Sequence, residues 1–197
     1  ISLEVLIGNE KAINLYKKYG LEIVDTRGEK HNMRKAAEGL LVSIRCVTYN
    51  HASYIRQCLD GFIMQKTSFR FEAIVHDDAS VDGTAEIIRE YAERYPDIIK
   101  PILETENQYS KHDGSLARIM NANLRGKYVA FCEGDDYWTD PLKLQKQVDY
   151  LETHPEWVMC CSDADIMTSS GVLDWSRYST SRNIPVEDVI IGGGLFL

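Results

Sequence analysis

Residues 40–49, LLVSIRCVTY, form a run of mostly apolar residues that is rich in β-branched side chains. Such a run is typical of a β-strand that is buried on both faces, as the parallel strands of helix-covered sheets are. Two similar runs follow, FEAIVHD at 71–77 and KYVAFC at 127–132. Segments with apolar residues at helical spacing separate the runs. This alternation predicts an α/β fold: an open, mostly parallel sheet with helices on both faces.

The same patterns place the other elements of this part of the chain. Helices are expected over 53–65, from Asp82 to Pro96, around 116–124, and after an Asp140-Pro141 cap. Strands are expected at 98–103 and 157–162, and Pro101 puts the first of these at a sheet edge or a bulge. The polar residues 105–114 are expected to form a mobile loop.

The first 39 residues differ from the rest, because they are close to neutral whereas the remainder carries the acidity of the chain. Strands are expected at 3–7, 21–24 and 31–34, with a helix over 10–19 that Asn9 caps. We therefore predict a small α/β appendage at residues 1–38 and a separate domain at 40–197.

Composition narrows the class of protein. A net charge of −8 argues against a basic nucleic-acid-binding face, and no apolar run is long enough to span a bilayer. The five cysteines form no C-x-x-C pair and indicate buried, reduced thiols in a cytoplasmic protein. No secretion leader is visible, the chain begins with Ile1, and we expect it to be a piece of a longer protein.

Acidic residues follow several of the predicted strands. Asp77 and Asp78 follow one strand, Glu133-Gly134-Asp135-Asp136 another, and Asp163 and Asp165 a third. Ligands of open α/β sheets bind at the carboxyl ends of the strands. Because clustered carboxylates repel one another, such an edge favours a hard divalent cation, Mg²⁺ or Mn²⁺, together with phosphate groups.

Each acidic residue also has a simpler interpretation. Asp77 and Asp78 can cap a turn, Asp82 and Asp140 can cap helices, and Asp163 and Asp165 can be ordinary turn residues. The run Glu133 to Asp136 can be a solvated acidic turn. Two acidic turns after two different strands favour a binding site over that alternative.

Three segments resemble the family 2 glycosyltransferases of the GT-A fold in the family's order and spacing: VSIRCVTYNHASYIRQCLDGFIMQ, EAIVHDDASVDGTAEIIREYAERYP and GKYVAFCEGDDYWTDPLKLQKQVDYLETHPE. The resemblance covers about residues 40–197. It implies a GT-A, Rossmann-like sheet that is incomplete at its C-terminal side. It also implies metal-dependent transfer of a sugar, with inversion, from a nucleoside diphosphate donor, most often a UDP-sugar, to an acceptor hydroxyl.

The resemblance implies roles for individual residues. Thr48 and Asn50 would line the nucleotide pocket, and Asp78 would accept a hydrogen bond from the nucleobase. Glu133 takes the place of the usual first Asp of the D-x-D motif and would face the ribose or the metal. Asp135 would bind both the nucleotide and the metal, with Asp136 as the following acidic residue at the metal.

The family's catalytic base lies in a later acidic motif, so we expect it C-terminal to Leu197; Asp163 and Asp165 are poor substitutes by position. The implied acceptor is a saccharide or a lipid-linked saccharide of bacterial surface polysaccharide. A place at the inner face of the membrane is compatible with such an acceptor. Lys111 is either a phosphate contact or part of a solvated loop.

LEVLIGNEKAINLYKKYGLEIVDT, residues 3–26, resembles the C-terminal part of an N-acetyltransferase of the ribosomal-protein-alanine type. In that family Asn9 and Tyr16 would lie near acetyl-coenzyme A. The glycine-rich pyrophosphate loop of the family does not precede this segment, so we expect a remnant with a structural role.

Three other functions are alternatives to this one. A nucleotidyltransferase needs a glycine-rich, basic phosphate loop after the first strand, and residues 48–51 contain neither glycine nor Lys or Arg. A non-catalytic nucleotide-sugar-binding fragment stays open, as does a bifunctional protein that also carries an N-acetyltransferase.

Overall fold

The computed structural model describes residues 2–6, 8–18, 21–27, 30–35, 39–162, 164–168 and 171–173. The first four of these segments, which end at residue 35, form a three-stranded antiparallel sheet in the order β1-β3-β2, together with one helix. Asn9 caps this helix as predicted, since its side chain accepts a hydrogen bond from the Ala12 N–H at 3.2 Å. The elements are β1 (Ser2–Leu6), α1 (Glu10–Lys18), β2 (Leu21–Arg27) and β3 (Lys30–Lys35).

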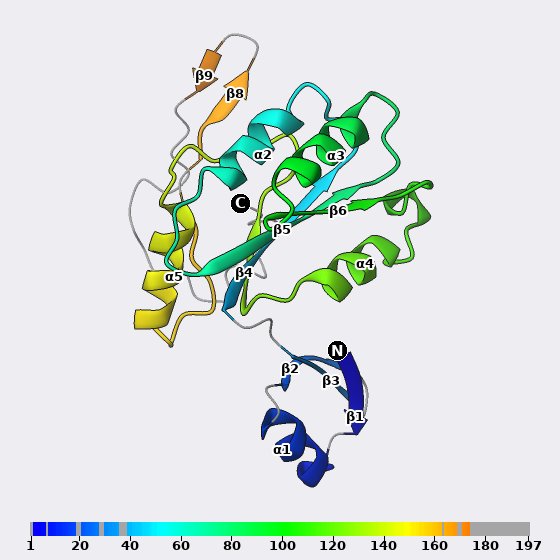
Figure 1. The fold of residues 1–197 in the computed structure, drawn as a ribbon, viewed down its shortest axis with the longest axis vertical. Coiled ribbons are helices and arrows are strands. Elements are labelled where there is room, and N and C mark those ends of the chain that lie inside the picture. The colour runs from blue at the N-terminus through cyan, green and yellow to red at the C-terminus, as the bar shows by residue number, and fades with distance from the viewer. Residues whose placement is uncertain are drawn as a thin grey trace. The chain divides into compact units, whose positions relative to one another are not determined.

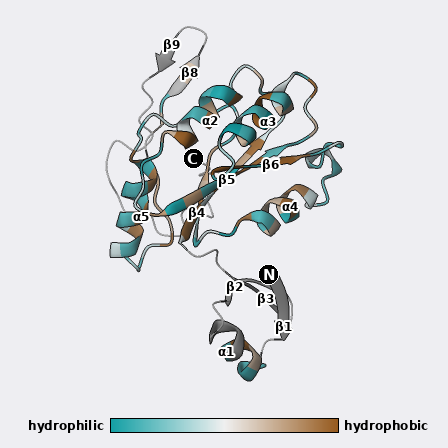
Figure 2. Ribbon diagram, in the orientation of Figure 1, coloured by the Kyte–Doolittle hydropathy of each residue, from teal (hydrophilic) through white to brown (hydrophobic). Residues whose placement is uncertain are grey.

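The predicted parallel sheet is confirmed, and it contains four strands in the order β6-β5-β4-β7 (Figure 1). All three pairings are parallel. The central strands carry the most apolar residues (Figure 2), and the Pro101-containing strand lies at an edge, where its missing N–H costs no ladder bond. The strands are β4 (Leu40–Thr48), β5 (Arg70–Asp77), β6 (Ile99–Leu103) and β7 (Tyr128–Phe131).

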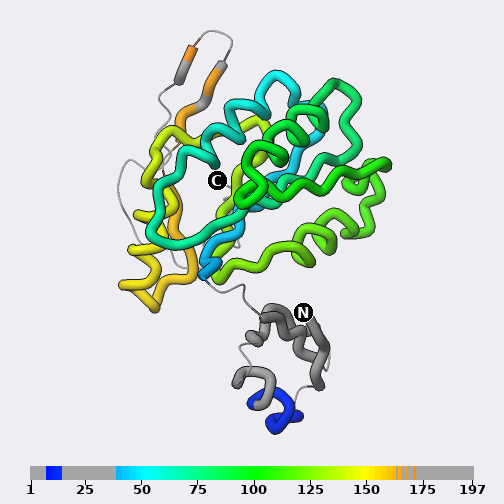
Figure 3. Tube along the Cα trace, viewed as in Figure 1, coloured from blue at the N-terminus to red at the C-terminus, as the bar shows by residue number. Residues whose placement is uncertain are grey.

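Helices connect these strands and cover both faces of the sheet. The chain moves outward from β4 through β5 to β6 and then returns past β4 to β7 (Figure 3). Because parallel crossovers are right-handed, α2 and α3 pack on one face and α4 on the other (Figure 1). The order of strands thus reverses between β4 and β7. The helices are α2 (Ile55–Ile63), α3 (Thr84–Arg94) and α4 (Ser115–Asn123).

The chain divides into two compact units, Ile1–Pro141 and Leu142–Leu197. The second contains α5 (Lys143–Thr153) and a hairpin of β8 (Ile166–Thr168) and β9 (Gly171–Leu173). The helix begins at Lys143 with Leu142 in the cap position, so the predicted Asp140 cap is wrong by two residues. The domain boundary after residue 38 stays a prediction.

The predicted strand at 157–162 is wrong. These residues adopt no strand, and Val158 and Met159 are exposed. An apolar run becomes a strand only where a neighbouring strand accepts its backbone hydrogen bonds, and none pairs with it in the described part of the chain. Within the described residues, none of the helices combines the length and the apolar character that a membrane span requires.

An ion pair between a buried carboxylate and a partly exposed arginine joins β5 to the segment before β7. The Glu72 side chain is 2% exposed and pairs with Arg125, whose side chain is 44% exposed. The Ser43 hydroxyl donates to Glu72 at 2.9 Å and accepts the N–H groups of Arg125 and Gly126 at 3.0 and 2.8 Å. This network fixes the entry into β7, and therefore the position of the residues that follow β7.

Arg125→Met is expected to lower the free energy of unfolding by about 2 kcal/mol, because it leaves a buried carboxylate with the Ser43 hydroxyl as its remaining partner. Urea unfolding measures the loss. The matched control is Arg56→Met, since the Arg56–Glu90 pair is 52% and 53% exposed and such pairs contribute below about 1 kcal/mol. Equal losses in the two variants would contradict the assignment of a structural role to the Glu72–Arg125 pair.

Candidate functional site

The last two residues of β4 accept hydrogen bonds from the turns that follow its neighbouring strands, β5 and β7. The Asp78 N–H donates to the carbonyl of Thr48 at 2.9 Å, and the Gly134 N–H donates to the carbonyl of Val47 at 2.9 Å. The turn after β5 and the acidic turn after β7 therefore flank the last residues of one strand. The order of strands reverses between β4 and β7, and open α/β sheets bind their ligands at such a point.

Side chains bind the loop after β4 to the turn after β5. The Asn50 N–H donates to the Ser80 hydroxyl at 2.8 Å, and the Asn50 side chain accepts the Val81 N–H at 2.9 Å. Asn50 lies at φ 56°, in the left-handed region that Asn tolerates better than most residues. The side-chain oxygen of Asn50 therefore stabilises the turn after β5. Its side-chain nitrogen makes no hydrogen bond within the described residues.

Asp82 contacts both the first turn of α3 and the loop after β4. Its carboxylate accepts the Thr84 N–H at 3.1 Å, the Thr84 hydroxyl at 2.6 Å and the Ala52 N–H at 2.9 Å. The hydroxyl contact is the main reason why the pKa of Asp82 is lowered. The predicted capping contact is present, although Gly83 occupies the cap position itself.

Gly134 lies against β4 so closely that no side chain fits there. A Cβ added to it would lie 2.6 Å from both Cβ and Oγ1 of Thr48 and 3.0 Å from Nδ1 of His51. Thr48 is 1% exposed, and neither its Oγ1 nor the Nδ1 of His51 has a hydrogen-bond partner. Buried polar atoms are nearly always paired, so two unpaired atoms beside one glycine mark a place where a ligand, an ion or water supplies the missing partner.

Glu133 and Asp135, the two ends of the predicted E-G-D motif, have different surroundings. Glu133 pairs with Arg45 at 3.2 Å, and the Arg45 guanidinium lies 5.6 Å from the centre of the Phe131 ring. Partial burial raises the pKa of Glu133, Arg45 counteracts this, and Asp135 and Asp136 raise it further. The longer side chain in the place of the usual Asp thus reaches an arginine on β4.

Asp135 and Asp136 are exposed, as is Glu133, but neither is paired with an arginine or lysine among the ion pairs of the described residues. Asp135 Oδ1 lies 3.9 Å from Nδ1 of His51. Partial burial raises the pKa of Asp136, Asp135 raises it further, and His51 lowers it. In the described part of the chain, no three His, Cys, Asp or Glu side chains group to hold a metal by themselves.

The residues of this turn nevertheless fit a hard divalent cation. Mg²⁺ and similar ions usually take one or two protein carboxylates and complete their coordination with substrate phosphates and water. Exposed carboxylates beside two orphaned polar atoms suit such a partly open site.

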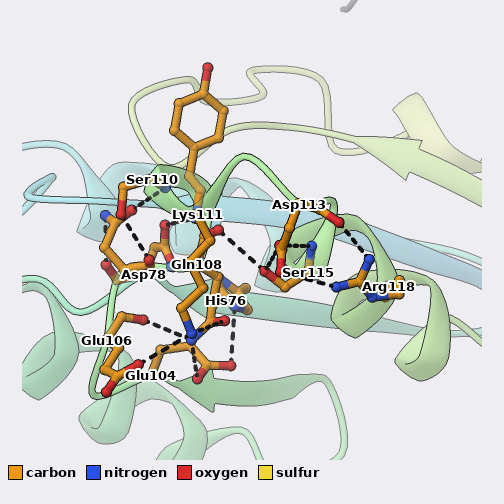
Figure 4. Close-up of polar contacts among 12 residues, drawn as sticks. His76, Asp78, Glu104, Glu106, Gln108, Ser110, Lys111, Asp113, Ser115 and Arg118 are labelled. Atoms are coloured by element: carbon orange, nitrogen blue, oxygen red, sulfur yellow. Dashed lines mark hydrogen bonds and ion pairs between the residues drawn. The ribbon is translucent and has the colours of Figure 1, made fainter.

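Asp78, predicted to accept a bond from the nucleobase, holds the loop after β6 (Figure 4). It is 1% exposed, and its two carboxylate oxygens accept the N–H groups of Gln108 at 2.6 Å and Tyr109 at 3.0 Å. The Asn107 side chain donates to the Asp78 carbonyl at 3.1 Å. The loop predicted to be mobile therefore contains a short helix, η1 (Tyr109–Lys111), fixed to the end of β5.

Charged groups of this loop pair with one another (Figure 4). Lys111 Nζ lies 3.2 Å from Glu106 and 3.0 Å from the Gln108 side-chain oxygen, so the amine is occupied within the loop. Glu104 lies 3.5 Å from the fully buried His76. Burial lowers the pKa of His76, and Asp78 and Glu104 partly offset this.

The structure thus brings the predicted residues Thr48, Asn50, Asp78 and Glu133–Asp136 to one edge of the sheet. Asp163 lies outside the described residues, and Asp165 is exposed in the second unit. All five cysteines are free; Cys46, Cys58 and Cys132 are buried as predicted, but Cys160 is half-buried and Cys161 exposed.

Sequence reasoning gave no role to His51 or Arg45. His51 directly follows the predicted Thr48–Asn50 segment. Arg45 lies opposite Phe131 in the β4–β7 register, which brings it close to Glu133 two positions later. This register is a property of the folded sheet, and no sequence pattern gives it.

Fold and site together define an open α/β protein with an acidic, partly open site where its strand order reverses. Residues 43–185 match glycosyl transferase family 2, and the chain belongs to that family.

Curated relatives span more sequence than this chain. An uncharacterized protein of Mycobacterium tuberculosis (strain H37Rv) is 48% identical over 151 residues, which are 76% of this chain and 43% of that protein. The UDP-Glc:alpha-D-GlcNAc-diphosphoundecaprenol beta-1,3-glucosyltransferase WfaP of Escherichia coli is 30% identical over 113 residues, 57% of this chain and 42% of that protein. The chain thus matches less than half the length of either relative.

Two solved structures are also similar. S. aureus TarS 1–349 in complex with UDP matches with a TM-score of 0.49 and 24% identity, over 58% of this chain and 33% of that one. The mannosyltransferase PcManGT from Pyrobaculum calidifontis, in complex with GDP-Man and Mn²⁺, matches with a TM-score of 0.47 and 30% identity, over 56% and 32%. Both scores are below 0.5, so neither structure assigns a ligand to this chain.

Proposed function

We propose that residues 40–197 bind the nucleotide sugar in a glycosyltransferase that moves a sugar from a UDP-sugar to an acceptor hydroxyl with inversion. The acceptor in this proposal is a saccharide or lipid-linked saccharide of bacterial polysaccharide, reached from the cytoplasm. Family membership supports the reaction class, and the similarity to the E. coli UDP-Glc glucosyltransferase supports the donor.

One observation carries the location of the proposed site. Thr48 Oγ1 and His51 Nδ1 are buried and unpaired beside Gly134, between two acidic turns. An uncharged ligand would leave the exposed carboxylates of the acidic turn repelling one another. A diphosphate with Mn²⁺ or Mg²⁺ removes that repulsion and supplies partners for the orphaned atoms.

Each residue of the site has a separate role in this proposal. Thr48 at the end of β4 and the side-chain NH₂ of Asn50 in the loop after it would contact the nucleotide, and Asp135 and Asp136 would face the cation. When bound, the cation would neutralise the charge that develops on the departing diphosphate. Arg45 holds Glu133 in place, which orients that carboxylate toward the ribose side of the acidic turn. The proposal places the catalytic base after Leu197.

Asp78 enters this proposal as the residue that shapes the base pocket. Because both of its oxygens hold the N–H groups of residues 108 and 109, it would position the loop against which a nucleobase lies. A direct hydrogen bond from the nucleobase to Asp78 would use the second lone pair of a carboxylate oxygen that already accepts one backbone N–H.

Calorimetry of UDP binding with and without Mn²⁺ tests the proposed function. Asp135→Asn is expected to weaken Mn²⁺-dependent binding at least about tenfold, because a charged ligand of the cation is lost. Asp97→Asn, which removes an exposed carboxylate after α3, is the control for the change in net charge. Wild-type protein that binds no UDP in either condition would refute the proposal, and equal affinities of wild type and Asp135→Asn would remove Asp135 from the site.

A further inference from the structure

His51 is held in a fixed place by its own backbone. Its N–H donates to the Thr84 hydroxyl at 2.9 Å, and its carbonyl accepts the N–H groups of Tyr54 at 2.9 Å and Ile55 at 2.8 Å, where α2 begins. Its ring lies edge-on to Tyr54, with 6.4 Å between ring centres. The imidazole is thus positioned by the end of β4, the start of α2 and the start of α3.

The Nδ1 atom of this ring points to the acidic turn without bonding to it. Nδ1 is buried and has no hydrogen-bond partner, and it lies 3.9 Å from Asp135 Oδ1. That separation is too long for a hydrogen bond. Two ligands bound at about 2.1 Å to one ion lie about 3.0 to 4.2 Å apart, depending on the angle between them. The observed separation falls within that range.

The surroundings favour a cation between these two groups over an accidental gap. Glu133 is occupied by Arg45, so its charge is already balanced. Asp135 has no such basic partner among the ion pairs of the described chain, apart from His51 itself. An independent sign of a ligand is Thr48, which is 1% exposed and whose unpaired Oγ1 faces the same glycine.

We propose that Nδ1 of His51 joins the carboxylate of Asp135 as a protein ligand of the divalent cation. This inference rests on the proposed function, since the remaining positions of the ion would be filled by diphosphate oxygens and water. The unprotonated Nδ1 that such a bond requires leaves the hydrogen of the neutral imidazole on Nε2.

A nitrogen ligand changes which ions the site prefers. Carboxylate and water suit Mg²⁺ and Mn²⁺ alike, whereas an imidazole nitrogen binds transition-metal ions, Mn²⁺ the most weakly of the first-row series, better than it binds Mg²⁺. His51 therefore gives this site a preference for Mn²⁺ over Mg²⁺ that two carboxylates alone would not give.

Electron spin echo envelope modulation of the protein–Mn²⁺–UDP complex detects directly whether a nitrogen atom is bound to the Mn²⁺ ion. A ¹⁴N coupling from a bound imidazole is expected in the wild type and is expected to be absent in His51→Gln. The control is His112→Asn, which removes an exposed imidazole at a left-handed position that Asn tolerates. It is expected to keep the coupling.

Competition between Mn²⁺ and Mg²⁺ for the UDP complex gives a second readout. His51→Gln is expected to reduce the preference for Mn²⁺ about fivefold or more, with a smaller change in the affinity for Mg²⁺. A wild-type complex that binds Mn²⁺ and UDP but shows no ¹⁴N coupling would overturn this inference and leave the proposed function intact. Absence of UDP binding with any cation would instead refute the proposed function.

Discussion

Gly126→Ala is expected to lower the free energy of unfolding by about 3 kcal/mol. A Cβ at this position would lie 2.5 Å from the Ser43 nitrogen and 2.6 Å from the carbonyl carbon of Val42. Both atoms belong to the backbone of β4, which is hydrogen-bonded to β5 and β7 and cannot move aside as a side chain would. The same substitution would disturb the hydrogen bond from the Gly126 N–H to the Ser43 hydroxyl.

Gly83→Ala separates this steric effect from the ordinary cost of replacing a glycine. Gly83 lies at φ 97°, and an added Cβ would meet no atom within 4 Å. Its replacement is expected to cost about 1 kcal/mol, from backbone strain alone. Urea unfolding of both variants gives the comparison. A loss for Gly126→Ala no larger than that for Gly83→Ala would show that β4 and the segment before β7 are not in such close contact.

Asp78→Asn is expected to cost about 3 kcal/mol and to release the loop after β6. Asn offers one acceptor oxygen where the carboxylate offers two, so its NH₂ group would face a backbone N–H of residue 108 or 109. A buried donor that faces another donor loses its hydrogen bond and is not compensated by water.

Limited trypsin digestion detects the release of this loop. The pairing of Lys111 with Glu106 is expected to slow cleavage after Lys111 in the wild type, and this cleavage is expected to become faster in Asp78→Asn. Asp113→Asn is the control in the same loop, since its amide oxygen can still accept the Ser115 N–H that Asp113 accepts at 2.9 Å. Similar cleavage rates in both variants would argue that Asp78 does not hold the loop.

Most of the sheet could be predicted from the sequence, because buried parallel strands leave a strong local signal. Residues 40–49 are apolar almost throughout, and Pro101 limited its strand to a sheet edge or a bulge, of which the structure shows the edge. The edge at which Asp78 and Asp135 gather also followed, since the carboxyl ends of parallel strands point the same way. These features depend on the spacing of apolar residues along the chain, which can be seen in the sequence alone.

The missed features depend on pairs of residues far apart in the chain. The ion pair of Arg45 with Glu133 spans 88 positions, and no pattern near either residue predicts it. The contacts of Asp78 with residues 108 and 109 span about thirty positions and convert a polar loop into an ordered one. The strand predicted at 157–162 failed for the converse reason: the apolar pattern was present, but the described chain supplies no partner strand.

The last two carbonyls of β4 hold the turns on either side of it: Val47 accepts from Gly134, and Thr48 accepts from Asp78. A single inserted residue near the end of this strand would displace both turns at once and reverse which face each side chain meets. Homologues should therefore vary in length within surface loops but keep the spacing from Leu40 to His51 free of insertions and deletions.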